Sequence, residues 1–138
     1  MYRYIRPLLF LLNPELAHHI SMKGLKLACF FGLIRRKNIN SKPIIIMGLK
    51  FPNRVGLAAG LDKNATCLQF FDHLGFGAIE VGTVTPKAQV GNSKPRLFRY
   101  PKEESIRNCM GFNNFGARFL KNRMKEYKSS RVPIGINI

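Results

Sequence analysis

Acidic residues are scarce in this sequence. Its 138 residues contain 7 Asp and Glu against 23 Lys and Arg, which gives a formal net charge of +16. A surplus of this size indicates an anionic partner, which can be nucleic acid, an acidic membrane surface or a phosphorylated ligand. The basic residues are spread along the chain, and no recognition motif or interleaved basic and aromatic face accompanies them. This distribution argues against a nucleic-acid-binding protein, in which basic residues gather on one helix or arm.

Cysteines are few, and Cys29, Cys67 and Cys109 lie far apart. Because no Cys-x-x-Cys pair and no Cys and His spacing typical of zinc is present, we expect no bound metal. An odd number of cysteines fits a reducing cytoplasm better than a disulfide framework. Cys29 and Cys67 are predicted to be small buried hydrophobic residues.

Long hydrophobic runs are absent as well. No segment approaches the roughly 18 apolar residues that a membrane span requires. The run over residues 8–12 is too short for a signal peptide, and no small-residue cleavage site follows it. Apolar residues nevertheless make up 46% of the chain, which is enough for a folded domain with a core. A position on a membrane surface stays open.

Residues 1–34 are predicted to form two short helices. Asn13 is suited to cap the second helix, with Pro14 at its first position and Glu15 in its first turn. Apolar residues then recur at helical spacing, so that the pair has more apolar surface than it can bury by itself. Two interpretations stay open: the pair packs on the rest of the protein, or its basic, amphipathic surface meets lipid.

The remainder of the chain alternates between buried strands and helices. A polar linker over 35–43 precedes an expected hairpin over 44–51. The expected elements that follow are strands at 55–59, 78–81 and 132–138, helices at 66–74 and 115–128, and short extended pieces at 97–99 and 105–107. Alternation of this kind predicts parallel βα units, as in a doubly wound sheet or a (β/α)8 barrel. A barrel typically needs about 250 residues, so if the fold is a barrel, these three strands are only part of it.

Small and polar residues follow each of the three expected strands, where ligands bind in α/β folds. They are Ala59, Gly60, Leu61, Asp62 and Lys63 after the first strand, Gly82, Thr83 and Thr85 after the second, and Asn137 near the end of the third. Small residues admit a flat ring, Thr and Asn offer directional hydrogen bonds, and Lys63 supplies a cation, which together suit a flavin. No G-x-G-x-x-G motif follows the first strand, which argues against a Rossmann site. The alternative is a set of tight turns with a solvated lysine.

The segment 107–116, RNCMGFNNFG, carries the second signal. Asn108, Asn113 and Asn114 both donate and accept hydrogen bonds through their side chains. Residues 110–112 offer consecutive backbone N–H groups just before an expected helix, where a carboxylate can bind. This combination predicts a pocket for a small, flat, polar acid. The alternative is that these residues only form turns and a helix cap.

Several longer stretches resemble one enzyme family. They are GLAAGLDKN, GFGAIEVGTVTPKAQVGNSKPRLFR, NCMGFNNFG and GINI, in this order along the chain. These stretches are similar to the dihydroorotate dehydrogenase family, in its membrane-associated, quinone-dependent class. NPELAHHI resembles the helical extension of that class, which the soluble class lacks. The resemblance implies an α/β fold, the N-terminal part of a (β/α)8 barrel (TIM barrel) over 43–138, preceded by a two-helix extension over 1–42.

The family implies roles for particular residues. FMN binding falls to Ala59, Gly60, Leu61, Asp62, Lys63, Thr83 and Asn137. Substrate binding falls to Lys63, Asn108, Cys109, Met110, Gly111 and Phe112. His18 and Arg99 match positions that line the quinone tunnel. For these two the alternatives are a surface or packing histidine and a solvated strand residue.

The resemblance also implies a reaction and a location. Dihydroorotate is oxidised to orotate in pyrimidine biosynthesis: a hydride leaves for FMN, a base removes a proton, and the electrons pass to ubiquinone. The enzyme is expected to be peripheral, on the cytoplasmic face of the bacterial inner membrane.

Two departures from the family pattern stand out. Cys109 replaces the arginine usual in the substrate segment. The serine base of this class lies in a later loop, beyond Ile138, so no catalytic base is expected here and the 138 residues alone are expected to be inactive. The alternative is a truncated, non-catalytic remnant that binds membrane through its basic helical pair.

Overall fold

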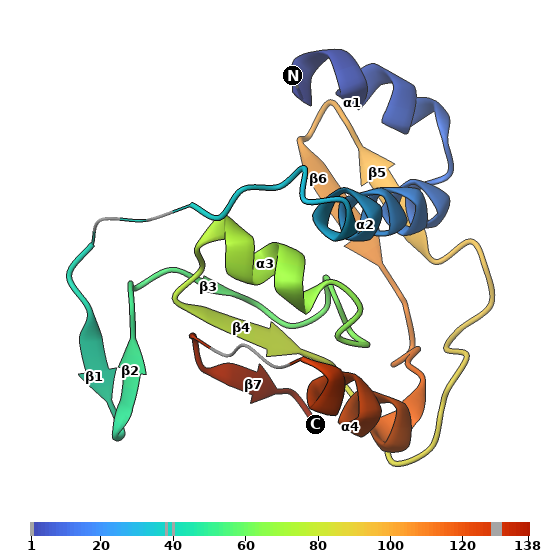
Figure 1. Cartoon of the computed structure of the whole chain (residues 1–138). Helices are drawn as coiled ribbons and strands as arrows, with labels where there is room; N and C mark the ends of the chain where they lie inside the picture. The colour runs from blue at the N-terminus through green and yellow to red at the C-terminus, as the bar shows by residue number, and fades with distance from the viewer. Residues whose placement is uncertain (1, 38, 40, 128–130) are drawn as a thin grey trace.

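The computed structural model describes residues 2–37, 39, 41–127 and 131–138. It begins with two helices, α1 (Tyr2–Leu11) and α2 (Pro14–Phe30), and a hairpin of β1 (Ile44–Ile46) and β2 (Leu49–Phe51). The elements that follow are β3 (Gly56–Leu57), α3 (Leu68–Leu74), β4 (Ala78–Val81), β5 (Leu97–Tyr100), β6 (Ser105–Asn108), α4 (Gly116–Glu126) and β7 (Ile134–Ile136). In Figure 1 the helical pair and the hairpin lie at opposite sides of the molecule. The order of the elements is the one that the sequence predicts.

Strands β3, β4 and β7 form a parallel sheet with β4 in the middle. Gly56 lies opposite Ala78 on one side of β4, and Ile79 lies opposite Ile134 on the other. Ile79 and Val81 are fully buried and form the centre of a core to which α3 and α4 also contribute. The predicted parallel βα units are therefore confirmed.

The first strand of this sheet is shorter than the sequence predicts. The N–H group of Val55 donates to the side-chain oxygen of Asn53 at 2.9 Å and is therefore used in a turn, although the carbonyl of Val55 accepts the N–H group of Gly77 at 2.8 Å. The strand begins at Gly56. Val55 is also 64% exposed. The continuous apolar run over 55–59 therefore overstates the length of the strand.

Helix α3 also begins later than expected. The carboxylate of Asp62 accepts the N–H groups of Thr66 at 2.8 Å and of Cys67 at 2.7 Å. These bonds hold both residues in a turn, so the helix begins at Leu68. Helix α4 begins at Gly116, one residue later than expected, and its expected end at residue 128 lies outside the described residues.

Helix α2 connects the extension to the sheet. Asn13 caps it as predicted, because its side-chain oxygen accepts the N–H group of Glu15 at 3.0 Å. Met22 and Cys29 are buried in the common core with Cys67, which confirms the prediction for both cysteines. The packing interpretation thus holds for the inner face of α2. None of the helices in the described part of the chain combines the length and the apolar composition of a membrane span.

The long loop after β4 contains an antiparallel ribbon. Leu97 of β5 lies opposite Asn108 of β6, and Tyr100 lies opposite Ser105. The ribbon lies beside α2 in Figure 1, and β5 contacts that helix. The extended pieces expected near 97–99 and 105–107 are therefore partners, and β6 leads directly into the segment 108–112.

Candidate functional site

Two hollows meet at the turn after β3. The smaller, of about 390 Å³, lies at the carboxyl ends of the three parallel strands and is lined by Ala59, Gly60, Lys63, Thr83, Gly111, Phe112 and Asn137. The larger, of about 560 Å³, lies beside α2, and His18, His19, Met22, Leu97 and Asn108 are among its lining residues. Gly60 and Lys63 line both hollows, so the turn after β3 forms part of the wall between them.

The smaller hollow brings the three strand ends together. The N–H group of Gly60 donates to the carbonyl of Gly82 at 3.0 Å, and the hydroxyl of Thr83 donates to the side-chain oxygen of Asn137. Gly82 has a φ of +102°, and a Cβ atom there would lie 2.4 Å from the carbonyl oxygen of Asn137. Only glycine fits this position, because both the backbone angle and the space exclude a side chain. The residues Ala59, Gly60, Lys63, Thr83 and Asn137, which the sequence predicts to lie together, therefore line one hollow in the structure.

Leu61 and Asp62 lie elsewhere than the rest of this cluster. Both line the larger hollow and not the smaller one. The Asp62 carboxylate is buried and is already bonded to the backbone and hydroxyl of Thr66 and the backbone of Cys67. Asp62 therefore shapes the turn that presents Lys63, and its predicted contact with FMN stays a prediction.

Lys63 places a positive charge at the wall that the two hollows share. Its ammonium group donates to the side-chain oxygen of Asn113 at 2.8 Å. Burial lowers the pKa of Lys63, and the nearby Arg96 lowers it further, while Glu15 acts in the opposite direction. A partly buried cation acts more strongly on a neighbouring ligand than a solvated one, because less water screens it.

The predicted substrate segment divides between the two hollows. Asn108 and Met110 line the larger one, whereas Gly111 and Phe112 line the smaller one. Cys109 is exposed and lines neither. The structure thus gives four of these residues access to a cavity that Lys63 shares, and it places the thiol of Cys109 outside.

The side chains of Asn113 and Asn114 make different hydrogen bonds. Asn113 lines the larger hollow and accepts the hydrogen bond from Lys63. Asn114 is buried, and its side-chain oxygen accepts the N–H groups of Gly116 at 2.8 Å and of Thr85 at 3.2 Å. The turn-forming alternative therefore holds for Asn114.

His18 and Arg99 are placed differently from one another. His18 lines the larger hollow, where burial is the main cause that lowers its pKa. Arg99 is not among the lining residues of that hollow. Its guanidinium group donates to the carbonyl of Leu12 at 2.9 Å and lies 4.6 Å from the centre of the Phe10 ring. Arg99 therefore secures the junction of α1 and α2, and the tunnel role of both residues stays a prediction.

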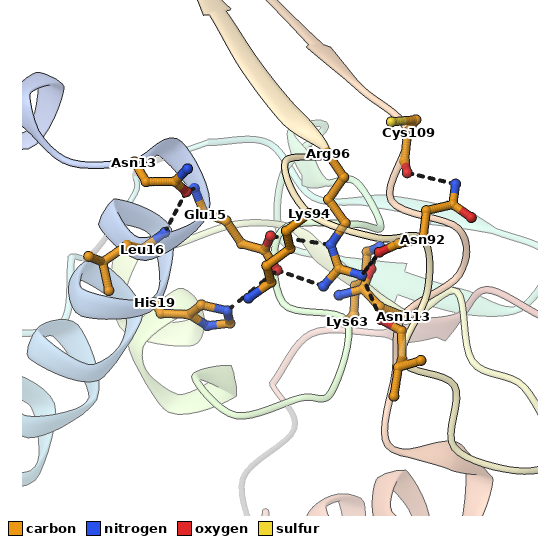
Figure 2. A network of polar contacts seen from close by, with 11 residues as sticks. Asn13, Glu15, Leu16, His19, Lys63, Asn92, Lys94, Arg96, Cys109 and Asn113 are labelled. Carbon is orange, nitrogen blue, oxygen red and sulfur yellow. Dashed lines mark hydrogen bonds and ion pairs between the residues drawn. The ribbon is translucent and has the colours of Figure 1, made fainter.

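Sequence reasoning missed the buried ion pair between Glu15 and Arg96, which Figure 2 shows. The two side chains form a fork, with Nε to Oε2 at 3.2 Å and Nη2 to Oε1 at 2.7 Å. The hydrogen bond from Arg96 is the main cause that holds the pKa of the Glu15 carboxyl below its usual range, and it outweighs burial. The scarcity of acidic residues could have indicated a buried ion pair. In a chain with 7 acidic and 23 basic residues, each carboxylate has many possible basic partners. Among the described residues, no group of three or more His, Cys, Asp or Glu side chains is placed to hold a metal ion.

Comparison with known proteins agrees with this geometry. The family model for Dihydroorotate dehydrogenase matches residues 43–138. A Dihydroorotate dehydrogenase (quinone) from Nitrosomonas europaea is 52% identical over 138 residues, covering 100% of this chain and 40% of the relative. The protein of the same name from Dichelobacter nodosus is 54% identical over 138 residues, covering 99% of this chain and 40% of the relative. The chain therefore spans about 40% of the length of these curated relatives.

Solved structures match as well. The ligand-free DHODH from Eimeria tenella has a TM-score of 0.75 and 38% identity, over 91% of this chain and 37% of that one. The same enzyme in complex with ferulenol gives a TM-score of 0.74 and 37% identity, over 90% and 35%.

The parallel βα units and these neighbours define the chain as part of a (β/α)8-barrel protein. Proteins of this class bind their ligands at the carboxyl ends of the strands. Within that class, the chain belongs to the dihydroorotate dehydrogenase family. The resemblance drawn from the sequence and the barrel prediction are both confirmed.

Proposed function

We propose that this chain supplies the first strands and the quinone-facing helices of an enzyme that oxidises dihydroorotate to orotate in pyrimidine biosynthesis and reduces ubiquinone. The observation that carries the proposal is the pair of hollows that share Gly60 and Lys63. Dihydroorotate and the quinone can bind in separate sites and still exchange electrons through a cofactor that lies at the wall between these sites. The names of the curated relatives support the quinone as the electron acceptor.

The residues of the smaller hollow fit FMN. The backbone at Gly60 has open space beside it for a flat ring, Thr83 and Asn137 present polar side chains, and Lys63 supplies the cation. FMN held by these residues would supply the redox chemistry, as acceptor of a hydride from the substrate and donor of electrons to the quinone. Gly111 and Phe112 border the same hollow, where their backbone can hold the carboxylate of dihydroorotate.

The residues of the larger hollow fit a quinone. Met22, Leu61 and Leu97 offer an apolar wall, and His18 offers a hydrogen-bonding group beside it. Sites for small hydrophobic molecules combine apolar walls with polar groups that orient the ligand. Charged residues such as Lys23, Lys26 and Asp62 also line this hollow.

The decisive experiment uses an extended chain, in which these 138 residues are continued by the part of the Nitrosomonas europaea relative that they do not cover. We expect the extended chain to purify with bound FMN and to oxidise dihydroorotate with decylubiquinone. The 138 residues alone are expected to reduce no dye, because the edges of β3 and β7 are open in the sheet and the family's serine base is not among them. A folded extended chain that takes up no FMN, or dye reduction by the 138 residues alone, contradicts the proposal.

We also propose that the helical pair binds the cytoplasmic face of the bacterial inner membrane. Tyr4, Leu8 and Leu11 lie on one side of α1 and are 81%, 65% and 83% exposed. Arg3 and Arg6, both exposed, lie on the same helix and can meet anionic headgroups. Membrane binding without catalysis is the second candidate function, and this exposed apolar face is the observation in its favour.

Vesicle binding tests the membrane proposal. Changing Leu8→Glu and Leu11→Glu in the extended chain removes on the order of 3 kcal/mol of apolar burial. We therefore expect at least tenfold weaker binding to vesicles that contain phosphatidylglycerol, and weaker binding of the unchanged chain at high salt. Met47→Glu, at a residue that is 97% exposed in the hairpin, is the matched control and should leave binding unchanged. Equal losses in both variants would show that the helical pair is not the binding surface.

A further inference from the structure

The ion pair of Glu15 and Arg96 joins parts of the chain that lie 81 residues apart. Glu15 is in the first turn of α2, and Arg96 directly precedes β5. Both side chains are almost fully buried, at 5% and 6% exposure. Lys94 and His19 also approach Glu15, at 3.6 and 3.9 Å, but both side chains are largely exposed and contribute little.

The same arginine also holds the loop that precedes it. Its Nη1 atom donates to the carbonyls of Val90 at 2.5 Å and of Asn92 at 3.0 Å. Its guanidinium group therefore uses all three nitrogens, two on Glu15 and one on the loop. Lysine cannot reproduce this arrangement, because an ammonium group is a compact charge without a planar fork.

That loop in turn holds the substrate segment. The backbone carbonyl of Arg96 accepts the N–H group of Cys109 at 2.9 Å, and the side chain of Asn92 donates to the carbonyl of Cys109 at 2.8 Å. The N–H group of Asn92 donates to the carbonyl of Met110 at 3.1 Å. A Cβ atom on Gly111 would lie 2.7 Å from the backbone of Asn92, so the two segments are in close contact. Figure 2 shows this chain of contacts running from α2 through Arg96 to Asn92 and Cys109.

We propose that Arg96 and Glu15 are positioning residues that fix the substrate segment 108–112 relative to α2. The larger hollow has α2 as one wall and Asn108 and Met110 as another, and the ion pair sets the separation of these walls. The inference rests on the proposed function, since it assigns the pair a part in holding dihydroorotate while α2 receives the quinone. Small displacements of positioning groups can cost large factors in rate, so the geometry of this pair matters beyond its contribution to stability.

A second ion pair in the chain serves as a control for an effect on stability alone. Arg36 and Asp72 form another ion pair with a 2.7 Å contact and a buried carboxylate. That pair ties the segment after α2 to α3 and lines neither hollow. Asp72→Asn should therefore lower the melting temperature without a change in substrate affinity.

The test compares Arg96→Lys, Glu15→Gln and Asp72→Asn in the extended chain. We expect the first two to raise the KM for dihydroorotate at least tenfold, with kcat changed less than threefold. Hydrogen exchange at the amides of Cys109 and Asn92 should accelerate at least tenfold in the same two variants, whether or not substrate is present. Glu15→Gln keeps the shape of the side chain and one of its two acceptor oxygens, so it remains informative if Arg96→Lys folds poorly.

Exchange and kinetics separate the possible failures. If the unchanged extended chain fails to oxidise dihydroorotate, the proposed function is wrong, and the exchange rates alone then decide whether Arg96 positions the segment. If the chain is active and the Arg96 and Glu15 variants match Asp72→Asn in KM and in exchange, the pair is a stability element only and the inference is overturned.

Discussion

Replacing Lys63 by methionine in the extended chain is expected to slow the reduction of bound FMN by dihydroorotate by a factor of about 10²–10³, the usual effect of removing one electrostatic group from an active site. Lys63 lines both hollows and donates a hydrogen bond to Asn113. In the proposed function its cation therefore lies where the flavin and its substrate meet. Methionine keeps the unbranched apolar stem of the side chain as far as the ε position and removes the charged nitrogen. Anaerobic stopped-flow measurement of flavin absorbance gives the rate directly.

The control for this substitution is Lys50→Met. Lys50 lies in β2, is exposed, and is remote from both hollows in the fold. It changes the net charge of the chain by the same amount, so any effect of overall charge is common to both variants. A Lys63→Met chain that retains FMN and is reduced as fast as the Lys50→Met chain would remove Lys63 from the site.

The convergence of the strand ends was predictable from the sequence because parallel strands place their carboxyl ends at one edge. Short apolar runs located β4 and β7, and the residues after them then had to be neighbours. Thr83 and Asn137, which are 54 positions apart, are in hydrogen-bond contact for this reason. This prediction required neither helix propensities nor the spacing of residues along the sequence.

The direction of individual side chains was not predictable in the same way. Asp62 follows a strand and has the chemistry of a ligand-binding residue, yet its carboxylate turns back to bond Thr66 and Cys67. Arg99 faces the junction of the helices, whereas Arg96, three residues earlier, is buried against Glu15. Such choices depend on backbone angles in turns and on contacts between distant segments, which a residue pattern does not encode.

The substitution Gly82→Ala is expected to weaken FMN binding by the extended chain. Gly82 adopts a φ of +102°, where a side chain costs about 1–3 kcal/mol of strain. The new Cβ atom would also lie 2.4 Å from the carbonyl oxygen of Asn137, a backbone atom that already accepts the N–H group of Val84 at 2.9 Å. Asn137 must therefore move, and its contact with Thr83 must break. We expect at least a tenfold loss of FMN affinity, measured by flavin fluorescence during titration of the apoprotein.

Gly48→Ala separates backbone strain from the loss of the hollow. Gly48 lies in the turn of the hairpin with a φ of +77°, and nothing lies within 4 Å of the position of an added Cβ atom. The substitution should therefore cost about 1–2 kcal/mol of stability through its backbone alone and leave FMN affinity unchanged. If Gly82→Ala instead binds FMN as tightly as Gly48→Ala, the hollow formed by the three strand ends is not where the flavin lies. The wall at Gly60 and Lys63 would then not be the place where electrons pass from dihydroorotate to the quinone.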